Sequence, residues 1–238
     1  MKVYEYGDPA ASTVLVQMAD DHDLAVLEKE AALIRELSGK AFRLIAVKVN
    51  DWNHDLSPWK APAVFGNESF GDGAEHTLSE VLKLLADIDK THLPGKDKTN
   101  LPGDSRMDVS KNSKMDLSGT ERTYYIGGYS LAGLFALWAV HQTDLFAGAA
   151  AASPSVWFPG FLDYMKEHEI RTKSVYLSLG DREEKTRNPV MSQVGSCIRS
   201  AHTLLEERGL RCTLEWNKGN HFKDPDRRTA KAFAWVMG

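Results

Sequence analysis

The stretch GYSLAG, residues 128–133, carries more information about the fold than any other part of the chain. It follows the β-rich run YYI at 124–126 and opens an apolar run of helical length, Leu131 to His141. A serine at a strand-to-helix turn, with small residues two positions before and after it, is typical of a nucleophile elbow. The turn strains the serine backbone, presents its hydroxyl and aims the first helical N–H groups at the same point. The pattern therefore predicts a nucleophilic Ser130 beside part of an oxyanion hole, with Ala132 in place of the usual glycine.

Composition and charge indicate one soluble domain. The chain has 238 residues, of which 42% are hydrophobic and 26% charged, enough for a sizeable core. A net charge of −4 gives no reason to expect nucleic acid or a membrane surface as partner. There is no secretory h-region and no uncharged run long enough to span a bilayer. Cys197 and Cys212 are too few for a disulfide framework and lack metal-site spacing, so we expect a cytoplasmic protein with reduced thiols.

Strand-like and helix-like segments alternate along the chain. The expected strands are 13–18, 42–49, 124–126, 146–152, 174–179 and 212–216. The expected helices are 23–37, 78–88, 131–141, 190–207 and 229–237. This alternation predicts a single α/β domain over residues 1–238, with a mostly parallel, doubly wound sheet flanked by helices. Ligand sites in such sheets lie beyond the carboxyl ends of the strands, where the elbow also lies.

A polar, turn-rich stretch at about residues 91–121 interrupts the alternation. It includes LPGKDK at 93–98 and LPGD at 101–104, and its apolar residues are scattered. A loop of this length is uncommon inside a compact domain. It could be a lid, a mobile excursion or a segment foreign to the fold. Because a lid needs an apolar underside, the composition favours a mobile loop inserted in the domain.

A serine nucleophile needs a base, and the base needs an orienting acid. Behind a nucleophile elbow these follow in the order acid, histidine, on loops after later strands. The loop KGNHF at 218–222 carries His221, which we expect to be the base. The loop GDREEK at 180–185 offers three carboxylates. Glu183 is the expected acid, with Asp181 and Glu184 as open alternatives.

A second oxyanion donor is expected from the loop after strand 13–18, where many hydrolases have a His-Gly pair. This chain has MADDHD at 18–23, and the backbone N–H of Ala19 is the candidate donor. The acidic cluster at 20–23 is not expected to bind a metal, because consecutive side chains rarely converge on one ion. Asp21 or Asp23 is expected to cap the following helix.

Several stretches together resemble the esterase D-like, feruloyl and siderophore esterase family of α/β hydrolases, which also includes mycolyltransferases. IGGYSLAGL at 126–134 is similar to the family's nucleophile stretch. FAGA at 146–149 running into SPSVW at 153–157 resembles the segment after the elbow helix. DLSPW at 55–59 and GDGA at 71–74 resemble the stretch before the helix that precedes the elbow. The resemblance covers most of the chain and implies the α/β-hydrolase fold.

Residue by residue, the resemblance implies Ser130 as nucleophile, His221 as base and the Leu131 N–H as oxyanion donor. It places the acid on the loop at 180–185. The chain departs from the family in lacking the His-Gly pair and in having Ala132 at a glycine position. The stretch at 91–121 has no recognised counterpart in the family.

These residues predict a serine carboxylic ester hydrolase that acts on a small-molecule ester through an acyl-enzyme, with no metal or organic cofactor. Two alternatives stay open: an acyltransferase with the same acyl-enzyme, and a non-catalytic binding protein that retains the fold. Residues expected at the pocket mouth are Trp52, His54, Asp55, Trp59 and Trp157. For Trp59 and Trp157, substrate contact is weighed against core packing.

Overall fold

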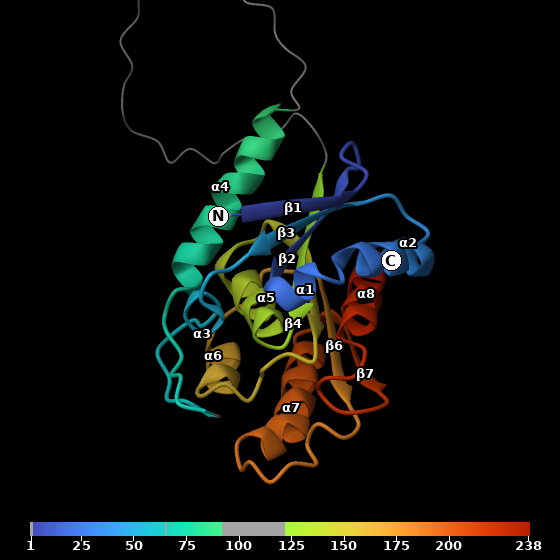
Figure 1. Cartoon of the computed structure of the whole chain (residues 1–238). Helices are drawn as coiled ribbons and strands as arrows, with labels where there is room; N and C mark the ends of the chain where they lie inside the picture. Colours follow the sequence, from blue (N-terminus) through green and yellow to red (C-terminus); the bar gives the residue numbers. More distant parts are fainter. Residues whose placement is uncertain (1, 65, 92–121) are drawn as a thin grey trace, which may run out of the picture.

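A seven-stranded sheet runs through the computed structural model, which describes residues 2–64, 66–91 and 122–238 (Figure 1). Its strands are β1 (Lys2–Gly7), β2 (Thr13–Ala19), β3 (Arg43–Lys48), β4 (Thr123–Tyr129), β5 (Phe146–Ala152), β6 (Ser174–Gly180) and β7 (Arg211–Asn217). The spatial order is β1-β3-β2-β4-β5-β6-β7. The edge strand β1 is antiparallel to β3, and all other pairs are parallel. The mostly parallel sheet predicted from the alternation is confirmed.

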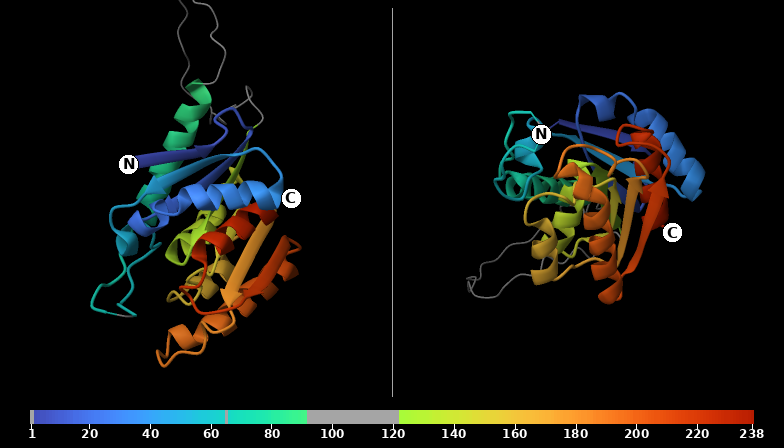
Figure 2. Two further views of the ribbon diagram at one scale, coloured as in Figure 1. Left: turned by 45° about the vertical axis from the view of Figure 1, so that its right-hand side comes forward. Right: turned by 90° about the horizontal axis from the view of Figure 1, so that it is seen from below.

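Helices cover both faces of this sheet. They are α1 (Asp21–Leu24), α2 (Leu27–Ser38), α3 (Trp52–Asp55), α4 (Ala74–Thr91), α5 (Leu131–Gln142), α6 (Phe161–Glu167), α7 (Val194–Glu207) and α8 (Pro225–Val236), with a 3₁₀ turn, Met191–Gln193, before α7. The helices α2 and α8 lie side by side on one face, where they enclose one core cluster with the sheet (Figures 1 and 2). The helices α4, α5, α6 and α7 supply the other cluster. The sheet is therefore doubly wound, as predicted.

The predicted helix at 23–37 is wrong in extent, because two helices occupy this region. Asp20 is the N-cap of α1: its carboxylate accepts from the N–H groups of His22 and Asp23. The Asp23 carboxylate accepts in return from the Asp20 N–H, which completes a capping box. The expectation that Asp21 or Asp23 is the cap is therefore wrong. This separate helical turn ends before α2 begins at Leu27.

Three short elements, β1, α3 and α6, were not predicted. The helices α3 and α6 are too short for a helical period to be visible in the sequence. The strand β1 is largely exposed at the sheet edge and lacks the apolar run of a buried strand. The polar stretch expected at 91–121 lies outside the described residues, apart from Thr91, where α4 ends. Among the helices that the structure describes, none is both long and apolar enough to cross a membrane.

The elbow helix α5 lies in the interior, and every residue from Leu131 to His141 is buried. A helix that is apolar on all sides requires cover on all sides, which the sheet and the surrounding helices supply. On the opposite face of the sheet, the ring of Phe233 from α8 reaches Gly127 in β4. A Cβ on Gly127 would lie 2.7 Å from the Phe233 ring and 2.7 Å from the Ala150 methyl. Close approach at these positions therefore fixes α8 against the strand that carries the elbow.

We expect Phe233→Ala to lower the free energy of unfolding by about 3–5 kcal/mol, because it opens a cavity between α8 and the sheet. Phe222→Ala is the matched control, since Phe222 is 85% exposed and its truncation should change stability by less than about 0.5 kcal/mol. Urea unfolding followed by tryptophan fluorescence measures both variants. Equal losses would contradict the packing described for α8.

Candidate active site

Ser130 lies between β4 and α5 in a strained backbone conformation, with φ 55° and ψ −117°. A non-glycine residue in this region costs about 1–3 kcal/mol and persists only where neighbouring contacts impose it. Here the Ser130 N–H donates to the Ala152 carbonyl at 3.1 Å. The Ser130 carbonyl accepts from the N–H groups of Leu134 at 3.1 Å and Ser155 at 3.0 Å. These bonds to β5, to α5 and to the segment after β5 hold the turn.

Small residues around the serine make this turn possible. A Cβ on Gly128 would lie 2.6 Å from the Ala132 methyl, closer than carbon atoms approach one another. A methyl at position 132 is therefore compatible with the turn because position 128 is glycine. A Cβ on Gly133 would lie 3.1 Å from the Gly128 carbonyl oxygen. The departure at Ala132 is thus accommodated within the elbow.

The structure brings Ser130, His221 and Glu183 together at the carboxyl ends of three parallel strands. His221 follows β7, and its Nε2 lies 3.1 Å from the Ser130 Oγ. Glu183 follows β6, and its Oε2 lies 2.7 Å from the His221 Nδ1. The order and spacing match a nucleophile, a base and an orienting acid.

The loop at residues 180–185, here called the acid loop, has two further carboxylates, and both point away from His221. The Asp181 Oδ1 accepts from the Gly219 N–H at 2.8 Å. This bond ties the acid loop to the loop at residues 218–222, here called the histidine loop. The Glu184 Oε2 pairs with the Arg199 guanidinium of α7 at 2.8 Å. Among the three carboxylates that the sequence left open, only Glu183 contacts His221.

The Glu183 carboxylate is held from both sides. Its Oε1 accepts from the Gly180 N–H at 2.6 Å, the Ser153 hydroxyl at 2.9 Å and the Arg228 Nη1 at 2.8 Å. Burial alone would raise the pKa of this carboxyl group, since only 6% of the residue is exposed. The bonds from His221, Gly180 and Ser153 outweigh burial and hold the pKa of Glu183 below its ordinary value. The carboxylate is therefore ionised at neutral pH.

A cavity of about 330 Å³ opens over the serine. Most of its lining is apolar, from Trp52, Phe70, Leu131, Trp157, Met191 and Phe222. Its polar lining is Asn53, Ser130, Ser155 and His221, and the Ser155 Oγ lies 3.4 Å from the Ser130 Oγ. The Ser130 hydroxyl thus faces a mostly apolar cavity with few polar groups.

Trp157 lines this cavity, as expected, but Trp59 does not. The Trp59 indole donates to the Pro159 carbonyl at 2.9 Å, and its ring packs against Phe158 and Tyr164. The expectation of a pocket-mouth Trp59 is therefore corrected: its ring is part of an aromatic cluster beside α6.

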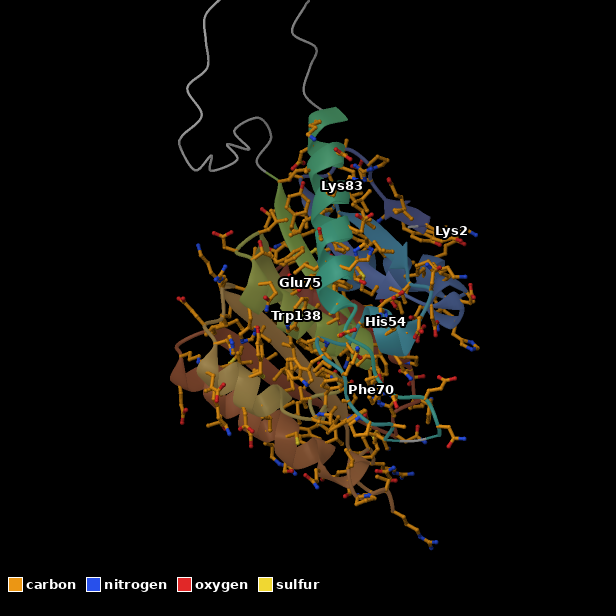
Figure 3. The ribbon with its side chains drawn as sticks, turned by 90° about the vertical axis from the view of Figure 1, so that its left-hand side faces the viewer. Lys2, His54, Phe70, Glu75, Lys83 and Trp138 are labelled. Atoms are coloured by element: carbon orange, nitrogen blue, oxygen red, sulfur yellow. The ribbon has the colours of Figure 1, made fainter. Side chains whose placement is uncertain are left out.

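Of the three residues expected near the pocket from α3, only Trp52 lines it. His54 packs instead against the loop at Gly71 and Gly73, where a Cβ would lie 2.4 and 2.6 Å from its ring. Phe70, from the same loop, does line the cavity, and Figure 3 shows it and His54 beyond the N-terminal end of α4. The glycines at 71 and 73 are thus required for close packing of this loop on α3.

The structure does not bring Ala19 to the cavity. Ala19 ends β2 fully buried, and its carbonyl accepts from the Val49 N–H at 3.1 Å. The residues after it form the capping box of α1. Asn53 of α3 lines the cavity instead, and among the described residues its side-chain amide makes no hydrogen bond. No sequence pattern had singled out Asn53.

Arg228 was also missed, although a signal was present. It occupies the same stripe of α8 as Ala232 and Val236, one and two turns later, and all three are buried. A charged side chain on an apolar helical stripe is rarely buried without a partner. This pattern could have indicated a buried ion pair, but not its partner Glu183.

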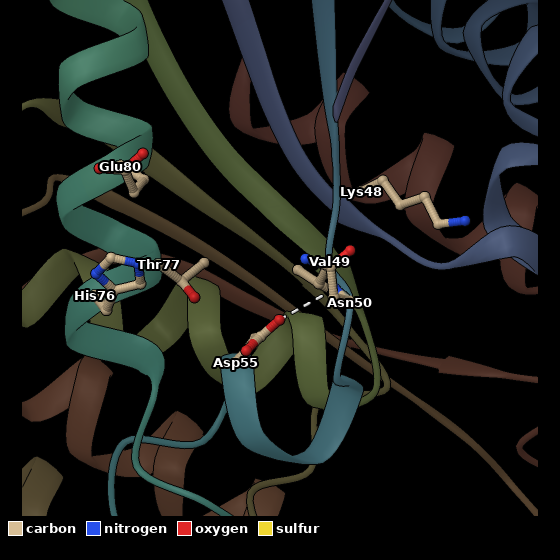
Figure 4. A pocket seen from close by; sticks show the side chains of 7 residues that line it. All are labelled: Lys48, Val49, Asn50, Asp55, His76, Thr77 and Glu80. Carbon is tan, nitrogen blue, oxygen red and sulfur yellow. Dashed lines mark hydrogen bonds between the residues drawn. The ribbon is translucent and has the colours of Figure 1, made fainter. Parts of the chain in front are cut away.

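A second cavity, of about 230 Å³, opens between α3, α4 and the end of β3 (Figure 4). It is polar, and Asp55 within it accepts from the Asn50 N–H at 3.1 Å. His76 and Thr77 are consecutive on α4, so their side chains diverge and do not form a nucleophile–base pair. Within residues 2–64, 66–91 and 122–238, no three His, Cys, Asp or Glu side chains are grouped to hold a metal ion.

Glu183 should make stability depend on pH. Because its folded-state pKa lies below the ordinary value of 4.5, its contribution is fully present above pH 4.5. It is lost as pH falls through the folded-state pKa. We therefore expect Glu183→Gln to destabilise the protein by about 1–3 kcal/mol at pH 7 and by less at pH 3.5. Urea unfolding at both pH values measures the difference.

Glu167→Gln is the control for this series, because Glu167 is exposed at the end of α6. Its unfolding free energy should stay within about 0.5 kcal/mol of wild type at both pH values. A Glu183→Gln effect that is the same at pH 7 and pH 3.5 would contradict the lowered pKa of Glu183.

No protein-family model matches the chain, and no curated protein sequence matches it. Solved structures do match. An IroE-like serine hydrolase from Shewanella oneidensis is 14% identical, with a TM-score of 0.68 over 98% of this chain and 72% of that one. The siderophore hydrolase EstA from Aspergillus nidulans is 17% identical, with a TM-score of 0.62 over 95% of this chain and 84% of that one.

The enterobactin esterase FES from Shigella flexneri is 14% identical, with a TM-score of 0.60 over 99% of this chain. The match covers 55% of that esterase, so the chain spans about half its length. The chain therefore has the α/β-hydrolase fold that these serine hydrolases and esterases share.

Proposed function

We propose that the chain is a serine carboxylic ester hydrolase that acts through an acyl-enzyme on Ser130. The observation that carries this proposal is the hydrogen-bonded series from the Ser130 Oγ through His221 to Glu183, at 3.1 and 2.7 Å. Ser130 lies on a strained turn, and both Ser130 and His221 line the mostly apolar cavity. The fold shared with serine hydrolases and esterases supports the same reaction class.

In the proposed mechanism, the His221 Nε2 accepts the Ser130 hydroxyl proton while Oγ attacks the ester carbonyl carbon. The tetrahedral oxyanion then collapses, the C–O bond to the alcohol breaks, and His221 returns the proton to the alcohol. His221 then takes a proton from a water molecule, whose oxygen attacks the acyl carbon. The bond between that carbon and the Ser130 Oγ breaks, His221 returns the proton to Oγ, and the acid is released. Throughout, the Glu183 carboxylate orients the imidazole and stabilises its protonated form.

The oxyanion needs N–H donors on the cavity side of Ser130. Leu131 lines the cavity as the first residue of α5, where backbone N–H groups are free to donate. For the second donor, we propose the side-chain amide of Asn53 in place of the Ala19 N–H. Asn53 lines the cavity and Ala19 does not. A side-chain amide can fill this role as well as a backbone N–H.

The cavity lining indicates the class of ester. Among the described lining residues there is no lysine, arginine or carboxylate to pair with a charged substrate. Burying an unpaired charge there would be costly, so the cavity suits an uncharged ester with an apolar group. The aromatic rings of Trp157 and Phe222 are the proposed contacts for that group.

We expect Ser130→Ala and His221→Ala each to lower kcat for p-nitrophenyl acetate and butyrate by about 10³-fold or more. Glu183→Gln should lower it by about 10²- to 10⁴-fold, because the imidazole loses its ionised partner. Asp181→Asn and Glu184→Gln are matched controls from the same loop and should retain most activity.

Fluorophosphonate labelling of the same variants distinguishes a wrongly assigned nucleophile from a protein without hydrolase activity. Activity that survives Ser130→Ala would refute the proposed nucleophile. A folded wild type that neither hydrolyses these esters nor is labelled would support a non-catalytic binding role. Faster acyl-enzyme turnover in an added alcohol, with formation of a new ester, would indicate an acyltransferase.

Asn53→Leu should lower kcat by about 10²-fold with little change in KM, because the amide is proposed to bind the oxyanion and not the ground-state carbonyl. Steady-state kinetics with p-nitrophenyl butyrate measures both constants. Asn50→Leu is the control, since Asn50 lines the polar cavity between α3 and α4 (Figure 4) and not the cavity over Ser130. A rise in KM alone would assign Asn53 to substrate binding.

A further inference from the structure

Arg228 has one of the largest fully buried side chains in the described chain, although it carries a charge. It lies in the first turn of α8, seven residues after His221. Its partner is the Glu183 carboxylate, 2.8 Å away, and each of the two side chains is 2% exposed. A buried arginine is rare without a specific partner, and here the partner is the proposed orienting acid.

The guanidinium of Arg228 joins four segments of the chain. Its Nη1 donates to the Glu183 Oε1 at 2.8 Å, the Tyr129 hydroxyl at 3.0 Å and the Ser153 Oγ at 3.2 Å. Its Nη2 donates to the Asn220 carbonyl at 3.0 Å. These partners belong to the acid loop, to β4, to the end of β5 and to the histidine loop.

Two of these contacts lie next to members of the proposed triad, and a third is with Glu183 itself. Tyr129 immediately precedes Ser130, and its hydroxyl also donates to the His221 carbonyl at 2.7 Å. Asn220 immediately precedes His221. Through these neighbours and through Glu183 itself, Arg228 is bonded beside all three members of the proposed triad.

The two loops approach this guanidinium closely because they have glycine where they meet. A Cβ on Gly180 would lie 2.8 Å from the Glu183 Oε1, 3.1 Å from the Arg228 Nη1 and 2.4 Å from the Gly219 carbonyl oxygen. Any side chain at position 180 would push the acid loop away from the histidine loop and from the guanidinium. The local sequence is thus compatible with a tight arrangement of the two loops around Arg228.

The charges around the pair are few. His221 faces Glu183 on the side opposite Arg228, and among the described residues the Tyr129 hydroxyl is the other titratable group in contact with the pair. Nearby carboxylates are engaged elsewhere: Asp181 accepts from the Gly219 N–H, and Asp226 of α8 pairs with a lysine of α2. Arg228 is therefore the cation that balances the buried Glu183 carboxylate when His221 is neutral.

We propose that Arg228 is a positioning residue for the catalytic triad: it keeps Glu183 ionised and oriented toward His221 and fixes the histidine loop against β4. This assignment rests on the proposed function. Arginine suits the task because its planar fork reaches acceptors on several segments at once, whereas lysine has a single ammonium group. Arg228 has no contact with the cavity and acts only through other residues.

The test compares kcat/KM as a function of pH for wild type, Arg228→Met and Arg228→Lys with p-nitrophenyl butyrate. In Arg228→Met, the Glu183 carboxylate has only protonated His221 as counter-charge. The proton on His221 is then held more strongly, so a higher pH is needed to obtain the neutral imidazole. The rise of kcat/KM on the acidic side of the profile should therefore occur about one pH unit higher than in wild type. The maximal kcat should fall about 10- to 100-fold.

Arg228→Lys keeps the positive charge but loses the planar guanidinium, which donates to several segments at once. Its acidic limb should stay near that of wild type, while kcat remains about 10-fold lower. Arg227→Met is the matched control, because Arg227 precedes Arg228 on α8 and is exposed. It should match wild type. A lower kcat with an unmoved limb in Arg228→Met, or identical behaviour of the Met and Lys variants, would overturn the proposal.

Two further readouts cover other outcomes. If Arg228→Met does not fold, a lowered kcat with unchanged KM in Arg228→Lys supports the proposal, and a wild-type kcat overturns it. Proton NMR of the His221 Nδ1–H tests the positioning without turnover. Its downfield resonance should appear at the wild-type position in Arg228→Lys and be displaced in Arg228→Met, because the Glu183 carboxylate that accepts this proton has lost its second counter-charge. An undisplaced resonance in Arg228→Met refutes the role of Arg228, whereas absence of Ser130-dependent hydrolysis in wild type refutes the proposed function.

Discussion

The strained turn at Ser130 is the constraint on which the surrounding structure depends. A backbone at φ 55° and ψ −117° is stable only if strand, helix and neighbouring loop are all in place. The turn requires glycine at 128, a small residue at 132 and a helix α5 that is buried along nearly its whole length. The small residues at positions 128, 132 and 133 follow from this close approach.

A second constraint is the buried charge behind the histidine. An ionised Glu183 away from water needs donors on every side, and four different segments supply them. The segments that carry these donors are consequently tied to one another. The position of the His221 imidazole is thus a property of the junction between β4, β5, β6 and α8 and does not depend on the histidine loop alone.

The sequence predicted the layered α/β fold and the residues Ser130, His221 and Glu183 because their signals are local. A strand, a turn and a helix in succession, or one histidine after a strand, can be recognised within a few positions. The positions of Asn53 and Arg228 could not be inferred in this way, because they depend on packing between distant segments. Trp59 shows the same limit: a tryptophan near a pocket motif can equally fill an aromatic cluster.

The long separations within the site have a consequence for folding. The Ser130–His221 hydrogen bond joins residues 91 positions apart, and Glu183 lies 38 positions before His221. Each comes from a different strand of a parallel sheet, whose pairings are non-local and form slowly. The Ser130 hydroxyl therefore meets the His221 imidazole only after most of the chain has found its native topology. Formation of this hydrogen bond during refolding would report the final stage of assembly, later than helix formation or collapse.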